Sequence, residues 1–385
     1  MSDLKKYNIF ITITSFSKLL VELFIPLILY DYGFTIKNII LYMIIKYTLC
    51  IIMIPITMKI NKKISWSKIM ILSSFFFSLT YIYLNIMTKS LLSLIILSII
   101  FSIYLIFYWL GRHIYGLSII EDKKTTDNVS LYTIFTVLGS IPATYIGSLI
   151  LKYFGFITLT IIVLILMLIS IIPLTKINKD IKYIKPNLKP IIKTFPKRNY
   201  LFTFIEQFRY ILNNIFPLYI YLYIKKEFTY IGITNLICGI GSIIYIFIIS
   251  KKMDKNKKDY LSISCILLSI LYIGKLNINN TNLFYIIVFI EGILKVTLDT
   301  IVQRNAYVYG RNYDVNSYIE FTELLNNIFR TIILIIFYLL NLNLRNIIYI
   351  GILGIFINSF VKYDDGKYGY KNLLKNELKN DGIKT

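Results

Sequence analysis

Long apolar runs separated by short polar stretches continue through this chain from end to end. Each run has about 20 residues, the length of a helix that crosses the hydrocarbon core of a bilayer. The runs lack the alternation of apolar and polar residues that barrel strands need, so the spanning segments are predicted to be helices. The twelve predicted spans are residues 8–30, 38–58, 69–88, 91–114, 129–151, 155–174, 200–224, 229–250, 259–275, 283–303, 318–341 and 345–361.

Composition supports this interpretation. The chain is 57% hydrophobic and only 16% charged, which is far more apolar than a soluble domain. Its net charge of +22 comes from basic clusters between the runs, as in the loops of membrane proteins, and therefore does not indicate nucleic-acid binding. The three cysteines lie inside apolar runs without metal-ligand spacing, so we expect neither a metal nor another cofactor. The predicted fold class is an all-α polytopic membrane protein.

A basic stretch from Thr175 to Arg198 divides the spans into two sets of six. It contains seven Lys, one Arg, one Asp and three prolines, and it is the longest interruption between apolar runs. We predict two six-helix bundles joined by a linker and followed by a polar tail. The boundaries are residues 1–174 for the first bundle, 175–199 for the linker, 200–361 for the second bundle and 362–385 for the tail.

The distribution of Lys and Arg predicts the orientation of the chain. With twelve spans, one side of the membrane receives the N-terminus, the central linker, the basic loops at 58–68 and 250–258, and the Lys-rich tail. Cytoplasmic loops carry the excess of basic residues in membrane proteins. Both termini and the linker are therefore expected in the cytoplasm, with the chain in the cell membrane.

Each half carries a basic loop between its second and third spans, as a duplicated six-span unit predicts. The basic residues there are Lys62, Lys63 and Lys68 in the first half, and Lys255, Lys257 and Lys258, beside Asp254, in the second. The fifth span contains Gly139, Pro142 and Gly147. In topology and in these stretches the chain resembles the major facilitator superfamily. FYWLGRHIYGLS at 107–118 and YIEFTELLNNIFR at 318–330 are similar to stretches of a bacterial branch of that family.

The resemblance implies a transporter whose central cavity is lined by the first, fourth, seventh and tenth spans. It also implies a monomer that works by alternating access, and close packing of helices at the glycines of the fifth span. We therefore expect a small-molecule solute as the main partner, and membrane lipid around the helices.

Ionisable side chains inside the spans are the candidate functional residues, because each costs about 2.5–3.5 kcal/mol on insertion scales. Glu291, Lys295 and Asp299 follow one another at intervals of four residues, on one helical face. These and the other charged groups are predicted to bind the solute or a coupling proton, with static ion pairing as the alternative. The predicted binding residues are Lys18, Glu22, Glu206, Arg209, Glu291, Lys295, Asp299, Glu323 and Arg330, and Arg112 and His113 are the candidates for a relay or gate.

The sequence favours a secondary transporter of a small solute with H⁺ as the expected coupling ion. It lacks the GxxxxGK[ST] loop of nucleotide-driven pumps. The main alternative is a flippase for a lipid or lipid-linked glycan. A membrane-embedded transferase has only His113 beside Arg112 in its favour, and a non-transporting scaffold would require all the charges to neutralise one another. We do not expect an enzyme.

Overall fold

The computed structural model describes residues 3–119, 125–177, 185–245, 260–278, 280–310 and 313–364, with the backbone alone for residues 117–119, 125–140, 304, 307 and 308. In these residues it is helical and has no β-strand, which confirms the predicted all-α polytopic architecture. Six segments among them are long and apolar enough to cross a membrane: Asp3–Asp31, Ile36–Ile60, Trp66–Ile86, Leu91–Gly116, Ile141–Thr175 and Val315–Leu339.

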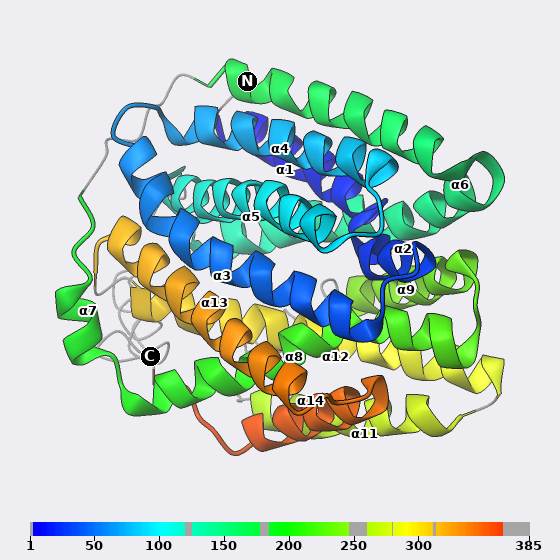
Figure 1. Ribbon diagram of the computed structural model, residues 1–385. Helices are drawn as coiled ribbons and strands as arrows, with labels where there is room; N and C mark the ends of the chain where they lie inside the picture. Colours follow the sequence, from blue (N-terminus) through cyan, green and yellow to red (C-terminus); the bar gives the residue numbers. More distant parts are fainter. Residues whose placement is uncertain are drawn as a thin grey trace.

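The first half of the chain forms the upper set of helices in Figure 1. Its elements are α1 (Asp3–Leu19), η1 (Glu22–Phe24), α2 (Ile25–Asp31), α3 (Ile36–Ile60), α4 (Trp66–Ile86), α5 (Leu91–Ile119) and α6 (Thr125–Thr175). The chain reverses direction within α6 at Gly155, where φ is 81° and ψ is 175°, a conformation that favours glycine. The two arms of α6 are therefore the predicted fifth and sixth spans.

The second half forms the lower set of helices in Figure 1. Its elements are α7 (Lys189–Thr194), α8 (Lys197–Tyr219), the π-helical turn η3 (Ile220–Ile224), α9 (Phe228–Ile244), α11 (Leu261–Asn277), α12 (Thr281–Gly310), α13 (Val315–Leu339) and α14 (Leu344–Asn358). Apart from α7, each helix corresponds to one predicted span. The basic loop predicted at 250–258 and the tail beyond residue 364 lie outside the described residues.

The first span is broken near its middle, whereas the sequence predicted one continuous helix. The α-helix α1 ends at Leu19, a 3₁₀ turn begins at Glu22, and α2 starts at Ile25. Pro26 explains the break, since a proline has no N–H to donate and its ring clashes with the carbonyl four residues earlier, here that of Glu22. Glu22 consequently lies in an irregular turn between two helices.

Among the described residues, the most extensive contacts between the two halves form two seams, one between α3 and α13 and one between α6 and α9. The beginnings of α1 and α8, together with α7, lie at the left of Figure 1, at what we name the linker end. The turn after α2 and the π-helical turn after α8 lie at the opposite end, which we name the far end. The inner helices between the seams enclose the site described below.

Glycine allows the fifth span to pack directly on the first. A Cβ atom built on Gly147 would lie 2.0 Å from the carbonyl oxygen of Leu20, which is too close for any other residue without backbone movement. Small residues permit such close approach of helices in membrane proteins. Gly147 therefore has the packing role that its motif implied.

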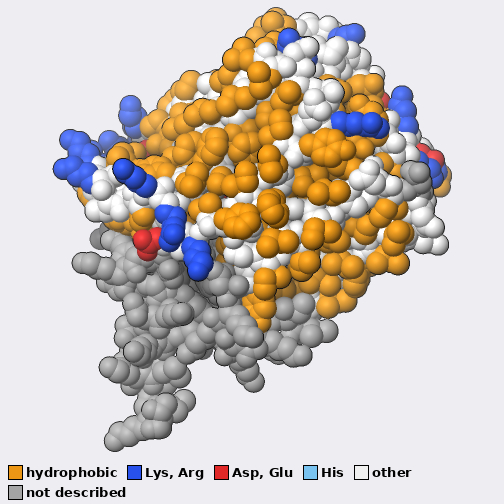
Figure 2. All heavy atoms as spheres, turned by 90° about the horizontal axis from the view of Figure 1, so that it is seen from below, with side chains coloured by type: hydrophobic (Ala, Val, Ile, Leu, Met, Phe, Trp, Pro, Cys, Tyr) orange, Lys and Arg blue, Asp and Glu red, His pale blue; other side chains and the backbone are white. Residues whose placement is uncertain are grey.

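One face of the second half is covered by hydrophobic side chains, and Lys and Arg gather toward its margins (Figure 2). Large apolar side chains of α11 and α14 are exposed in that half, namely Ile263, Leu267, Ile270, Ile273, Leu353, Phe356 and Ile357. A soluble monomer rarely exposes so large a continuous apolar surface. This face is suited to contact with lipid chains.

Candidate functional site

A large cavity lies between the two halves and extends toward the linker end. Its volume is about 530 Å³, within the range of roughly 300–1,000 Å³ that is usual for small-molecule sites. Its charged and ionisable lining comes from four helices. Arg112 and His113 lie on α5, Arg209 on α8, Asp299 on α12 and Glu323 on α13. The cavity thus brings together candidate residues that are up to about two hundred positions apart in the chain.

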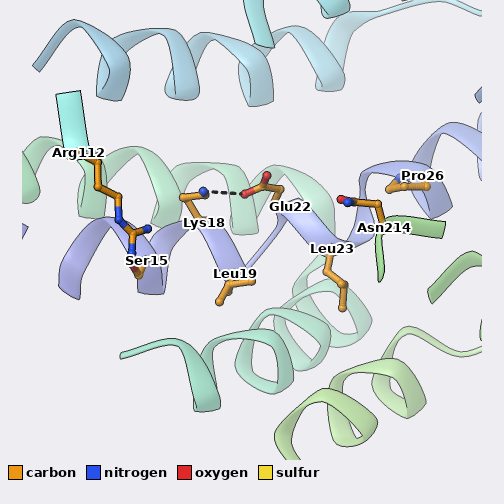
Figure 3. Close-up of a pocket in the computed structure, with 8 residues that line it drawn as sticks. All are labelled: Ser15, Lys18, Leu19, Glu22, Leu23, Pro26, Arg112 and Asn214. Carbon is orange, nitrogen blue, oxygen red and sulfur yellow. Dashed lines mark ion pairs between the residues drawn. The ribbon is translucent and has the colours of Figure 1, made fainter. Parts of the chain in front are cut away.

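A second cavity of about 240 Å³ adjoins the first, and Arg112 and Asn214 line both. Figure 3 shows Lys18 and Glu22 pointing toward each other, with Arg112 and Asn214 on either side. The Lys18 ammonium lies 3.4 Å from a Glu22 carboxylate oxygen. It also lies 4.5 Å from the centre of the Tyr108 ring, where a cation is attracted by the π-system. The break in the first span therefore positions Glu22 in the wall of the second cavity.

Trp109 is flanked by three of the candidate side chains. The Lys18 ammonium lies 5.0 Å and the Arg112 guanidinium 4.9 Å from the centre of the indole ring system. The imidazole of His113 stacks on the same indole at 5.4 Å, with an angle of 19° between the planes. Nε2 of His113 is in turn 4.0 Å from a carboxylate oxygen of Glu323 on α13. The predicted relay or gate residues thus lie where the halves meet near the linker end.

Arg209 holds two carboxylates from different helices. Its Nε donates to Glu206 at 2.7 Å, and one of its terminal nitrogens donates to Asp299 at 2.7 Å. The other oxygen of Glu206 accepts a hydrogen bond from Asn358 of α14 at 3.0 Å. The Glu206 side chain is 11% exposed and that of Asp299 is 61% exposed. Glu206 is therefore buried in the bundle, and Asp299 faces the cavity.

Glu291 is bound by two lysines in the second half. Its carboxylate oxygens lie 2.7 Å from Lys275 of α11 and 2.8 Å from Lys295, one turn along α12. The predicted acidic and basic stripe on α12 is thus divided between two clusters. Glu291 and Lys295 face α11, whereas Asp299 faces Arg209 of α8.

Two cations are held by aromatic rings on the seam between α3 and α13. The Arg330 guanidinium lies 3.6 Å from the centre of the Tyr210 ring and donates to Gln207 at 2.7 Å. Lys46 is only 5% exposed, and its ammonium is 4.4 Å from the centre of the Tyr47 ring. The Tyr47 and Tyr210 rings contact each other edge to face at 6.4 Å. Among the described residues, neither cation forms a salt bridge with a carboxylate.

Three features of this region are not predicted by the sequence. Lys46 and Lys275 are absent from the predicted binding residues, although each is buried beside aromatic rings. The contact between Asp31 and Tyr221 joins the last residue of α2 to the π-helical turn η3, far apart in the sequence. Lys46 and Lys275 could have been found in the sequence as single lysines inside apolar runs, since burying an ionised group requires a partner or a function.

Comparison with known proteins adds the family and the fold. The sequence model described as Major Facilitator Superfamily matches residues 8–320, and no curated protein sequence matches the chain. The crystal structure of the human organic anion transporter MFSD10 (TETRAN) is similar, with a TM-score of 0.65 over 93% of this chain and 98% of that one. The sequence identity is 8%, so this likeness shows the fold alone. Because the family match covers most of its length, the chain belongs to the major facilitator superfamily and is a multi-pass membrane transporter.

Proposed function

We propose that the protein is a secondary transporter that moves a small organic solute with an acidic group together with a proton. The observation that carries the proposal is the pair of adjoining cavities between the halves, with Arg112 in the wall of both. A guanidinium beside aromatic rings is well suited to bind a carboxylate or a phosphate. The family match supports transport itself. Since the structurally similar MFSD10 is an organic anion transporter, organic anions are the first solutes to test.

The charges around the cavities give a physical reason for proton coupling. Among the described residues, three permanent cations line the two cavities, and so do three carboxylates, namely Glu22, Asp299 and Glu323. Arg209 also binds the buried Glu206, so these cations have no spare positive charge for a bound anionic solute. A proton on one of the carboxylates offsets the added negative charge, because burial and nearby negative charge both favour the protonated form of an acid. Solute and proton are therefore expected to move together.

Alternating access requires contacts that break in turn at the two ends. At the far end, Asp31 and Tyr221 join the halves through hydrogen bonds. At the linker end, His113 and Glu323 form a pair across the halves. In the proposed cycle the bundles 1–174 and 200–361 rock about the seams, and one contact opens while the other closes. The Lys-rich linker would face the cytoplasm.

The test is solute-dependent proton flux in proteoliposomes that contain the purified full-length protein. A panel of carboxylate-bearing solutes is added on one side, against an imposed pH gradient, and proton movement is followed with a trapped dye. We expect flux with at least one solute, and loss of the coupled proton in Asp299→Asn or Glu22→Gln. Glu227→Gln is the matched control, since Glu227 pairs with Lys225 just after the π-helical turn, and both side chains are about half exposed.

Other outcomes separate the alternatives. Solute uptake without proton movement in every variant would leave a uniporter and exclude coupling. If folded protein gave no flux with any solute but scrambled labelled phospholipids, the flippase interpretation would replace the proposed one. The use of both solutes and lipids makes either result decisive.

A further inference from the structure

The cluster of Lys275, Glu291 and Lys295 has more positive than negative charge. Two ammonium groups share one carboxylate, so the net charge of the three side chains is +1. The side chains of Lys275 and Glu291 are 3% exposed, and that of Lys295 is 24% exposed. A buried charge without a counter-charge is costly in a membrane protein. A counter-anion would remove that cost.

A small cavity lies directly against the cluster, between α8, α9 and α12. Its volume is about 50 Å³, and among the described residues that line it Glu291 is the only carboxylate. About 10–15 Å³ of such space suffices for one water molecule. The cavity therefore has room for a small ion or the end of a carboxylate, and it is about one tenth of the size of the 530 Å³ cavity.

The polar wall of this cavity consists largely of hydrogen-bond donors. The amide oxygen of Asn213 accepts a hydrogen bond from Tyr272 at 2.8 Å, which leaves its amide NH₂ group available for donation. Asn235 also lines the cavity, and its side chain forms no hydrogen bond with another described residue. With the ammonium of Lys295, these groups supply the N–H donors that an anion needs.

The apolar part of the wall lowers the local dielectric constant and so strengthens the electrostatic attraction. Leu23, Phe216, Ile231 and Val288 line the cavity together with the polar groups. The ring of Phe216 also covers Lys275, whose ammonium lies 3.9 Å from the ring centre. Coulomb attraction increases as the effective dielectric constant falls. A single anion would therefore be held by charge and by N–H donors, beside an apolar surface.

We propose that the cluster and its cavity form a binding site for a small monovalent anion of about the size of chloride. Apart from Leu23, the described residues that line the site belong to the second half of the chain, and the site does not depend on the identity of the transported solute. Asn213 lines both this cavity and the 530 Å³ cavity, so an anion bound here would lie next to the solute site without occupying it.

The experiment measures the binding of radiolabelled chloride to the purified full-length protein, with gluconate as the replacement anion at constant ionic strength. We expect saturable binding of about one chloride per chain and a melting temperature that rises with chloride concentration. Lys295→Met removes the excess charge and should abolish binding. Glu291→Gln raises the net charge to +2 and should tighten binding at least tenfold. Lys225→Met, which alters a cation outside the site, should bind chloride as the wild type does.

Lys295→Met and Glu291→Gln are expected to change the chloride affinity in opposite directions. Misfolding would weaken binding in both variants, so it cannot produce this result. Asn235→Leu gives a further check, because it removes a donor without changing the charge and should weaken binding about tenfold. Unchanged chloride affinity in Lys295→Met, or no saturable binding in folded wild-type protein, would overturn the proposal. If formate bound and chloride did not, with formate binding lost in Lys295→Met, the anion site would stand and its ligand would be a carboxylate.

Discussion

The hydroxyl group of Tyr221 lies 3.0 and 2.9 Å from the two carboxylate oxygens of Asp31. This contact joins the two halves at the far end, and the ring of Phe24 packs edge to face on Phe228 beside it. A hydrogen bond to a charged group contributes about 1.5–3 kcal/mol. Since about 1.4 kcal/mol changes an equilibrium tenfold, Tyr221→Phe should raise the population that is open at the far end by at least about tenfold.

Spin labels at Lys89, between α4 and α5, and at Asn346, near the start of α14, report this opening as a longer distance by double electron–electron resonance. The labels are introduced after replacement of the three native cysteines. Tyr223→Phe is the matched control, because the Tyr223 ring contacts Tyr219 and Arg345 within the second half. An unchanged distance distribution in Tyr221→Phe would show that the contact does not close the far end.

Neutralising the two carboxylates bound to Arg209 should have different effects. Glu206 is buried and bonded to both Arg209 and Asn358, so Glu206→Gln breaks a buried network, for which removal of one partner costs about 3–5 kcal/mol. Asp299 is largely exposed to the cavity, where an ion pair contributes about 0–1 kcal/mol. We expect a much lower melting temperature in Glu206→Gln, and nearly wild-type stability but impaired transport in Asp299→Asn. Equal losses of stability in the two variants would contradict the assignment of Glu206 to a structural role and of Asp299 to transport.

Spacing in the sequence accounts for the ion pair within α12. Glu291 and Lys295 are four residues apart and so lie on the same helical face, whereas Lys18 of α1 reaches Glu22 across the break in the first span. Asp299 is a further four residues along, and at about 100° per residue it is rotated about 80° from Glu291. This rotation turns it away from α11 and toward α8. A stripe defined by spacing alone therefore overestimates how far one cluster extends.

Ion-pair and hydrogen-bond partners on different helices depend on how the helices pack, and the periodicity of the sequence does not predict them. Lys275 binds Glu291 because α11 lies against α12, and Asn358 binds Glu206 because α14 lies against α8. By contrast, the number and order of the spans follow from apolar length and from charge between the runs, which are local properties. Local sequence thus predicts the fold and most of the charged residues that line the cavities, and the helix packing decides which charges meet.

The packing of the fifth span on the first can be tested with two glycines. A Cβ at Gly147 would meet the backbone carbonyl of Leu20 at 2.0 Å, so Gly147→Ala must displace a helix. At Gly274 the nearest atom is the terminal methyl of Ile287 at 3.3 Å, which can move. Overpacking typically costs about 1–3 kcal/mol. We expect a clearly lower melting temperature in Gly147→Ala and little change in Gly274→Ala, and similar stabilities would refute the close approach.

Lys46 provides a case in which stability and function should change in opposite directions. Its ammonium is buried against Tyr42, Tyr47 and Phe101 and has no salt bridge to a described carboxylate. Replacing a buried ion pair by apolar side chains of similar volume is often neutral or stabilising, by about 1–4 kcal/mol, and a buried ammonium without a carboxylate partner has less attraction to lose. Lys46→Met should therefore melt at the same or a higher temperature. Lys46→Met should also lose much of the solute-dependent flux. A buried charge without an ionic partner departs from the usual packing rules, and such departures occur mainly at functional sites. If Lys46→Met were destabilised and still transported solute normally, the contacts of Lys46 with the aromatic rings would be purely structural. In that event Lys46→Arg, which keeps the positive charge, should restore the stability.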